Sequence, residues 1–111
     1  MAYTLKAFGP TQLSGSGAST IYTVPASTQG ILKHFTISNA NASARTVQIW
    51  IVPTGGSATD SNALINALSI PGNGVLTWDG FQVLPTAGDT IQGQASATTS
   101  LTFRGSGMEQ T

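Results

Sequence analysis

The sequence predicts an all-β fold, an antiparallel β-sandwich of about eight short strands. Three observations predict it. Turn-forming residues recur at short intervals, apolar and polar residues alternate between them, and no stretch has the apolar spacing of a long helix. A chain of 111 residues matches one domain, and at that length it can bury a single core without disulfides.

Each expected strand begins or ends beside a residue that favours a turn. Pro25, Pro53, Pro71 and Pro85 bound apolar segments, and clusters of Gly, Ser, Asn and Asp fill the intervals. Gly-Asn-Gly at residues 72–74 indicates a tight hairpin, while residues 60–68 allow a helix of only one or two turns. The strands expected on this basis span residues 21–24, 31–38, 46–52, 64–70, 74–78, 81–84, 90–97 and 101–108.

Alternation within the strands separates a buried face from a hydrated one. In the strand 31–38, Ile31, Lys33, Phe35 and Ile37 share one side, and Leu32 lies on the other. The outward positions of the later strands carry mostly hydroxyl and amide groups, as expected for an antiparallel sheet with one face in water. The expected inward set comprises Phe35, Ile37, Val47, Ile49 and Ile51.

The first twenty residues differ from the rest of the chain. Gly9-Pro10 and the Ser-Gly repeat at 14–17 interrupt any regular element. We therefore expect residues 1–20 to form an extended, flexible N-terminal arm that orders against a partner, and residues 21–111 to form the single sandwich domain.

The composition excludes several classes of function. Only 8 of the 111 residues are charged, the formal net charge is zero and there is no cysteine, whereas an ordinary domain is about a quarter charged. A chain with so little charge cannot steer towards nucleic acid or an anionic membrane, so neither is an expected partner. No segment has the apolar core of a signal peptide, and synthesis in a cytoplasm is expected.

The groups that catalysis needs are almost absent. The one histidine is His34, and the acidic residues are Asp60, Asp79, Asp89 and Glu109. No serine has an adjacent base, and no cluster of ligands fits zinc or calcium. We predict no enzymatic activity, no catalytic residue, no cofactor and no metal. The alternative is a cell-wall hydrolase. It requires two side chains among His34, Asp60, Asp79 and Asp89 to meet in a cleft.

Large side chains are the remaining candidates for function. Aromatic residues on a weakly charged face are typical of protein interfaces, and the predicted interface residues are Tyr3, Leu5, Phe8, Trp50, Trp78 and Phe81. Burial in the core is the alternative for both tryptophans, favoured for Trp50 and evenly balanced for Trp78.

Three segments of the chain carry a family resemblance. They are IYTVPA at residues 21–26, ILKHFTISN at 31–39, and Val83-Leu84 followed by AGDTIQG at 87–93. Together they resemble a group of small structural proteins of tailed bacteriophages, over about residues 20–109. The resemblance implies a virion protein with a β-sandwich fold that works as an oligomer, and it brings no catalytic residues.

We therefore expect a jelly-roll-like sandwich that assembles as a symmetric homo-oligomer, a trimer. It would bind the major capsid protein or another virion protein as a capsid decoration or cement protein, located in the virion after synthesis in the bacterial cytoplasm. The longer loop at residues 53–60 is a candidate contact specific to its virion. The alternative is a tail, baseplate or fibre component, including a receptor- or carbohydrate-binding module in which Trp50, Trp78 and Tyr22 stack on sugar rings.

Overall fold

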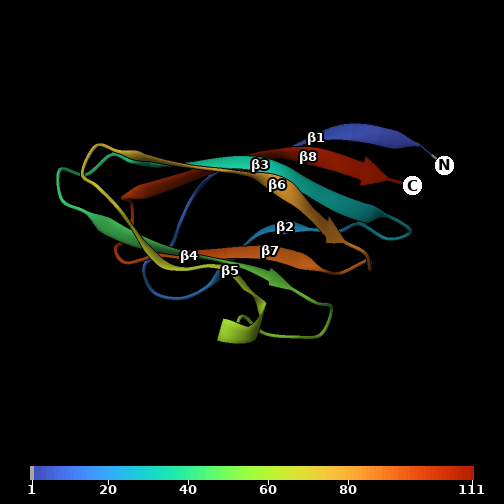
Figure 1. The fold of residues 1–111 in the computed structure, drawn as a ribbon. Helices are drawn as coiled ribbons and strands as arrows, with labels where there is room; N and C mark the ends of the chain where they lie inside the picture. The colour runs from blue at the N-terminus through green and yellow to red at the C-terminus, as the bar shows by residue number, and fades with distance from the viewer. Residues whose placement is uncertain (1) are drawn as a thin grey trace.

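The computed structural model describes residues 2–111, which fold into two four-stranded sheets packed face to face (Figure 1). Sheet A has the strand order β1-β8-β3-β6, sheet B has the order β2-β7-β4-β5, and every neighbouring pair is antiparallel. This order is that of a jelly roll, so the predicted fold class is confirmed. The elements are β1 (Tyr3–Gln12), β2 (Ser19–Thr23), β3 (Gln29–Asn39), β4 (Arg45–Val52), the 3-10 helix η1 (Asp60–Asn62), β5 (Ala63–Ile70), β6 (Val75–Leu84), β7 (Thr90–Ala95) and β8 (Leu101–Gln110).

The core lies between the two sheets and is built from their inward-facing residues. Four of the five side chains predicted to face inward, Phe35, Ile37, Val47 and Ile49, are buried, and Ile51 is half-buried against the same cluster. Side chains of this size each stabilise the fold by about 1.5–3 kcal/mol when removed from water. The alternation of the sequence therefore identified most of the core of the central strands.

A β-bulge at Lys33 changes the phase of β3. The register of β3 against β8 shifts between Leu32 and His34, which gives β3 one extra residue there. As a result Leu32 and Phe35 are both fully buried, while Lys33 is exposed. The prediction that Leu32 and Phe35 lie on opposite faces is wrong, because strict alternation fails across a bulge.

The structure contains no free N-terminal arm within residues 2–20. Residues Tyr3–Gln12 form β1, which pairs with β8 along its length, and Phe8 and Leu13 are buried in the core. The Ser-Gly segment that follows is packed as well: the Ala95 amide donates to the Ser14 carbonyl at 3.0 Å, and Gly15 donates to Thr98 Oγ1 at 3.1 Å. The expected boundary at residue 20 is therefore wrong, because Gly9-Pro10 lies at a register shift within β1 and not at its end.

The two strands expected at residues 74–78 and 81–84 are one strand, β6. The Asp79-Gly80 pair forms a bulge instead of a turn, because the register between β3 and β6 shifts at this point. A Cβ atom on Gly80 would lie 2.7 Å from the ring of Trp78, so the glycine makes room for the indole. The tight turn expected at residues 72–74 is present, with the Gly74 amide donating to the Pro71 carbonyl at 2.9 Å. The expected hairpin is wrong, because β5 belongs to sheet B and β6 to sheet A, so the turn connects the two sheets.

Two buried polar side chains fix the loops at the two ends of the sandwich. At one end the carboxamide nitrogen of Asn39 lies 3.0–3.1 Å from the carbonyl oxygens of Ser43, Ile70 and Pro71. At the other end Asp89 accepts hydrogen bonds from Thr54 and Thr86. Buried polar groups with several partners specify one loop arrangement, because leaving any partner unpaired is costly. Within residues 2–111, no helix has the length and apolar character needed to cross a membrane.

Candidate interaction surface

The outer face of sheet A carries a row of apolar side chains across all four strands. Leu5 on β1 is opposite Met108 on β8, Met108 is opposite Ile31 on β3, and Ile31 is opposite Val83 on β6. We call Leu5, Met108, Ile31 and Val83 the apolar row. Leu5 is 85% exposed and Ile31 is buried, so the row runs from open solvent at the β1 edge to a covered centre.

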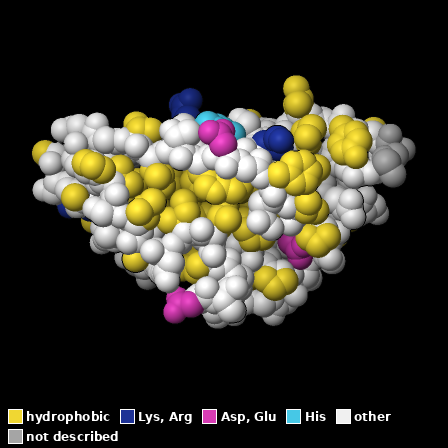
Figure 2. Space-filling view, in the orientation of Figure 1, with side chains coloured by type: hydrophobic (Ala, Val, Ile, Leu, Met, Phe, Trp, Pro, Cys, Tyr) yellow, Lys and Arg dark blue, Asp and Glu magenta, His cyan; other side chains and the backbone are white. Residues whose placement is uncertain are grey.

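Further exposed apolar residues lie beside the apolar row. Tyr3 on β1 is 61% exposed, and Phe81 on β6 is 60% exposed with the Lys33 ammonium 5.0 Å from its ring centroid. Five of the six large hydrophobic side chains that are exposed within residues 2–111 belong to β1 or β6, the two edge strands of sheet A. Figure 2 shows hydrophobic side chains at the surface near β1 and in a band between the sheets. A concentration of this kind is typical of a protein interface.

Four of the six predicted interface residues, those on β1 together with Phe81, separate into two groups. Tyr3, Leu5 and Phe81 are exposed, which agrees with a surface role. Phe8 is only 2% exposed and packs on Tyr22, with ring centroids 4.5 Å apart, so its assignment to an interface is wrong. Its burial follows from the inclusion of β1 in sheet A.

The two tryptophans occupy different places. Trp78 is half-buried at the inner face of β6 and stacks on Phe35, with ring centroids 5.2 Å apart. Trp50 is 5% exposed but lies outside the main core cluster, because its register opposite Gln92 puts it on the outer face of sheet B. The 3-10 helix η1 lies against β4 there, and no partner within residues 2–111 bonds the Trp50 indole nitrogen. The interface prediction is therefore wrong for Trp50, whose burial was the favoured alternative.

The third aromatic of the expected sugar-binding platform is also covered. Tyr22 is buried, and its hydroxyl donates to Glu109 Oε2 at 2.5 Å. Burial, followed by the hydrogen bond to Glu109 and the charge of that carboxylate, raises the pKa of the Tyr22 phenol far above its ordinary value. Trp50, Trp78 and Tyr22 therefore do not form a common exposed platform.

One acid–base pair does meet, on the open outer face of sheet A. His34 Nδ1 lies 2.7 Å from Asp79 Oδ1, and their side chains are 40% and 78% exposed. Neither side chain lines any of three surface depressions within residues 2–111, and both are open to solvent. Within residues 2–111, no three His, Asp or Glu side chains come together as a metal site.

The Asp89 carboxylate is an internal anchor of the loops. Burial alone would raise its pKa, but hydrogen bonds from the Thr86 amide, the Thr54 amide and the Thr54 hydroxyl outweigh it and lower the pKa below the ordinary value. All three donors stabilise the charged form of the carboxylate. Asp89 therefore has a structural role at this end of the sandwich.

Sequence reasoning did not identify Ile31, Met108 or Val83 as surface candidates. Each shares the row with Leu5 only once β1 is paired with β8, β8 with β3 and β3 with β6, and these strands lie far apart in the sequence. For Ile31, the bulge at Lys33 also reverses which residues of β3 share a face.

No protein-family model matches this chain, and no curated protein matches it. Among solved structures, the sandwich is similar to part of a chain in the structure of infectious bursal disease virus Gx strain, with a TM-score of 0.50 and 9% sequence identity. The similarity covers 98% of this chain and 33% of that chain, so this chain spans about a third of the protein that it resembles. The likeness shows a common fold, an antiparallel jelly-roll sandwich.

Proposed function

We propose that this protein is a non-enzymatic structural component of a virion, a decoration or cement protein that binds the assembled capsid as a symmetric homo-oligomer, a trimer. The observation that carries the proposal is the apolar row on the outer face of sheet A, with Leu5 85% exposed. Two further observations support it: the fold occurs in a chain of a virus structure, and the segments within residues 20–109 named above resemble phage structural proteins.

The chemistry of this face suits attachment to protein. The apolar row contains no charged residue. Lys33 and His34 on β3 and Asp79 on β6 lie beside the row, further along these strands from Ile31 and Val83. Protein interfaces have this arrangement, with an apolar centre and a polar rim. The β1 edge adds backbone groups that can pair with a strand of a neighbour, replacing the contacts expected from a free arm.

Stabilisation of the shell would follow from mass action. A protein that binds the assembled capsid and not the free subunits lowers the free energy of the assembled state. In a trimer, three copies of a weak contact act together, because binding of one subunit places the others at a high effective concentration. Moderate affinity per subunit is then sufficient for stable attachment.

The test is sedimentation of purified protein with capsids that lack it and, separately, with isolated tails. We expect saturable uptake by capsids at a fixed copy number, reduced at least about tenfold in affinity by Leu5→Ser, because a buried leucine contributes about 1.5–3 kcal/mol. Leu68→Ser is the matched control, since Leu68 is an exposed leucine on β5 of sheet B.

Three outcomes of this experiment contradict parts of the proposal. Uptake by tails alone would assign the protein to the tail, baseplate or fibre. Uptake by neither particle would contradict a virion role. Equal loss with Leu5→Ser and Leu68→Ser would contradict the assignment of the apolar row as the attachment surface.

A further inference from the structure

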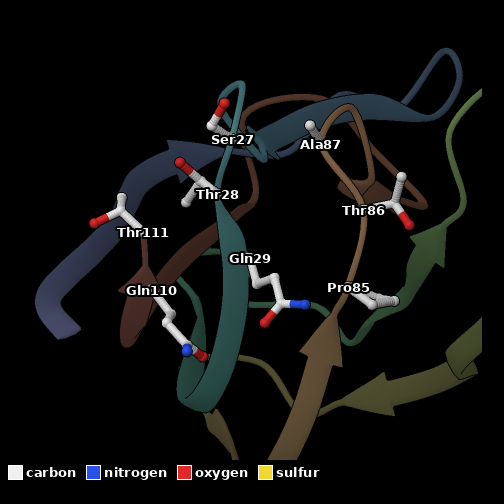
Figure 3. Close-up of a pocket in the computed structure, with 8 residues that line it drawn as sticks. All are labelled: Ser27, Thr28, Gln29, Pro85, Thr86, Ala87, Gln110 and Thr111. Carbon is white, nitrogen blue, oxygen red and sulfur yellow. The ribbon is translucent and has the colours of Figure 1, made fainter. Parts of the chain in front are cut away.

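A groove lies at the end of the sandwich where β3 begins and β6 ends. It has a volume of about 440 Å³ and is formed by the start of β3, the end of β8 and the loop after β6 (Figure 3). Figure 3 shows the Gln29 side chain between Gln110 on one side and Pro85 on the other. The lining residues are Ser27, Thr28, Gln29, Pro85, Thr86, Ala87, Gln110 and Thr111.

We propose that this groove binds a neutral saccharide through the carboxamides of Gln29 and Gln110 and the exposed ring of Tyr3. The proposal goes beyond attachment to a capsid and does not depend on it. None of the lining side chains ionises, whereas six of the eight carry a hydroxyl or a carboxamide. A charged ligand would find no counter-charge on these side chains, but sugar hydroxyls both donate and accept hydrogen bonds, as hydroxyl and carboxamide groups do.

The two glutamines are placed to act together. Gln29 and Gln110 are directly opposite in the pairing of β3 with β8, which puts their Cβ atoms about 5 Å apart on one face of sheet A. Their carboxamides have no hydrogen-bond partner within residues 2–111, in contrast to Gln48, which donates to Asn66 at 2.7 Å. Two free carboxamides side by side can bind adjacent hydroxyls of one sugar ring.

An exposed aromatic ring lies in the same row. Tyr3 on β1 is opposite Gln110 on β8, so Tyr3, Gln110 and Gln29 form consecutive positions across three strands. The Tyr3 side chain is 61% exposed. An exposed ring beside polar groups can stack on the apolar C–H face of a sugar. This role differs from the one expected for Trp50, Trp78 and Tyr22, which do not form a common exposed platform.

Hydrogen bonds within the chain hold the wall of the groove opposite Tyr3 in place before any ligand binds. The Thr86 amide donates to Asp89 Oδ2 at 3.0 Å, and Thr54 Oγ1, which bonds Asp89, lies 2.8 Å from the Ala87 carbonyl oxygen. On the other wall the Thr28 hydroxyl donates to the Ala26 carbonyl at 3.0 Å. A preformed groove reduces the ordering cost of binding, which matters for a weak, neutral ligand.

The test is calorimetric titration of the full chain with four neutral trisaccharides: maltotriose, cellotriose, mannotriose and chitotriose. We expect at least one to bind with a Kd of about 1 mM or tighter, and Gln29→Ala and Gln110→Ala each to weaken it at least about fivefold, since each variant removes one or two net hydrogen bonds. Tyr3→Phe should retain binding and Tyr3→Ser should lose it, because stacking needs the ring and not the hydroxyl.

Gln12→Ala is the matched control, because Gln12 is an exposed glutamine at the far end of β1. Folding of every variant is checked by its urea midpoint. Failure of all four sugars to bind at about 10 mM overturns the proposal, and so does equal weakening by Gln12→Ala and Gln29→Ala. The measurement uses the free protein, so its result is separate from that of the capsid experiment.

Discussion

The hydroxyl of Thr54 donates a hydrogen bond to Asp89 Oδ1 at 2.9 Å, and this contact joins two loops that are 35 positions apart in the sequence. The backbone amide of Thr54 donates to the same oxygen at 2.9 Å, and the amide of Thr86 donates to Oδ2 at 3.0 Å. One carboxylate therefore connects the loop after β4, the loop after β6 and the start of β7. It also holds the wall of the groove that contains Thr86 and Ala87.

The stability of the protein should fall in acid because of Asp89. Its pKa is lowered in the folded state from an ordinary value of 3.8, so the unfolded chain takes up the proton first. The stabilisation is fully present above pH 3.8 and is lost as the pH falls through the lower pKa of the folded state. Asp89→Asn should therefore cost about 1–3 kcal/mol at pH 7 and progressively less below pH 3.8. Urea unfolding at a series of pH values measures this, and a penalty that does not change with pH would contradict it.

Asn39 should be among the most sensitive polar positions. Its carboxamide is buried, contacts the carbonyl oxygens of Ile70 and Pro71, and accepts a bond from the Asn41 amide. Asn39→Ala removes these contacts and leaves the Asn41 amide without its partner, and it should lower the free energy of unfolding by about 2–3 kcal/mol. Asn66→Ala, which removes one exposed hydrogen bond on β5, should change it by less than about 0.5 kcal/mol. Chemical denaturation of both variants tests the difference, and equal effects would refute the role of Asn39.

Gly80 should tolerate no side chain, because the Trp78 indole occupies the space. A Cβ atom there would lie 2.7 Å from the ring, which must then move off Phe35. Gly80→Ala should cost about 1–3 kcal/mol and shift the tryptophan emission to longer wavelength as the indole becomes more exposed. Gly17→Ala is the control, since no atom lies within 4 Å of a Cβ at that position. Unchanged emission and stability in Gly80→Ala would contradict the packing of Trp78.

The fold class and the central core could be predicted from the sequence because they depend on local patterns. Alternation in residues 31–38 and 46–52 identified Phe35, Ile37, Val47 and Ile49 as core, and Gly-Asn-Gly identified the tight turn before β6. Bulges are different, because an extra residue at Lys33 or Gly80 is defined only by the strand that it fails to match.

The candidate surfaces depend on pairing between distant strands. The apolar row needs β1 beside β8, and the groove needs Gln29 beside Gln110, a contact across 81 positions that no local pattern encodes. Composition indicated a surface without catalytic groups, but only the register showed which residues share it. The incorrect prediction of an arm at residues 1–20 has the same origin. Gly9-Pro10 taken alone predicts the end of a strand, and only the pairing of β1 with β8 shows that the strand continues.

The N-terminal segment should be essential for folding, in contrast to a flexible arm. Phe8 lies in the core 4.5 Å from the Tyr22 ring centroid, and β1 covers one edge of β8. Phe8→Ala should therefore cost about 3–5 kcal/mol. Lys6→Ala, on the exposed part of the same strand, should stay within about 0.5 kcal/mol. If Phe8→Ala unfolds at the same urea concentration as the parent chain, β1 is not part of the folded sandwich.

Attachment to the capsid, if it uses the apolar row, should depend little on salt. Screening weakens interactions between exposed charges, and the Debye length falls from about 14 Å to about 4 Å between about 0.05 and 0.5 M NaCl. The apolar row has no charged member, so the Kd for capsids should change by less than about threefold over this range. Arg104→Gln, which removes a charge from the outer face of sheet A, should leave the affinity within about twofold. A tenfold loss of affinity in high salt, or with Arg104→Gln, would show that charged residues beside the row provide the attachment, because apolar burial is not weakened by added NaCl.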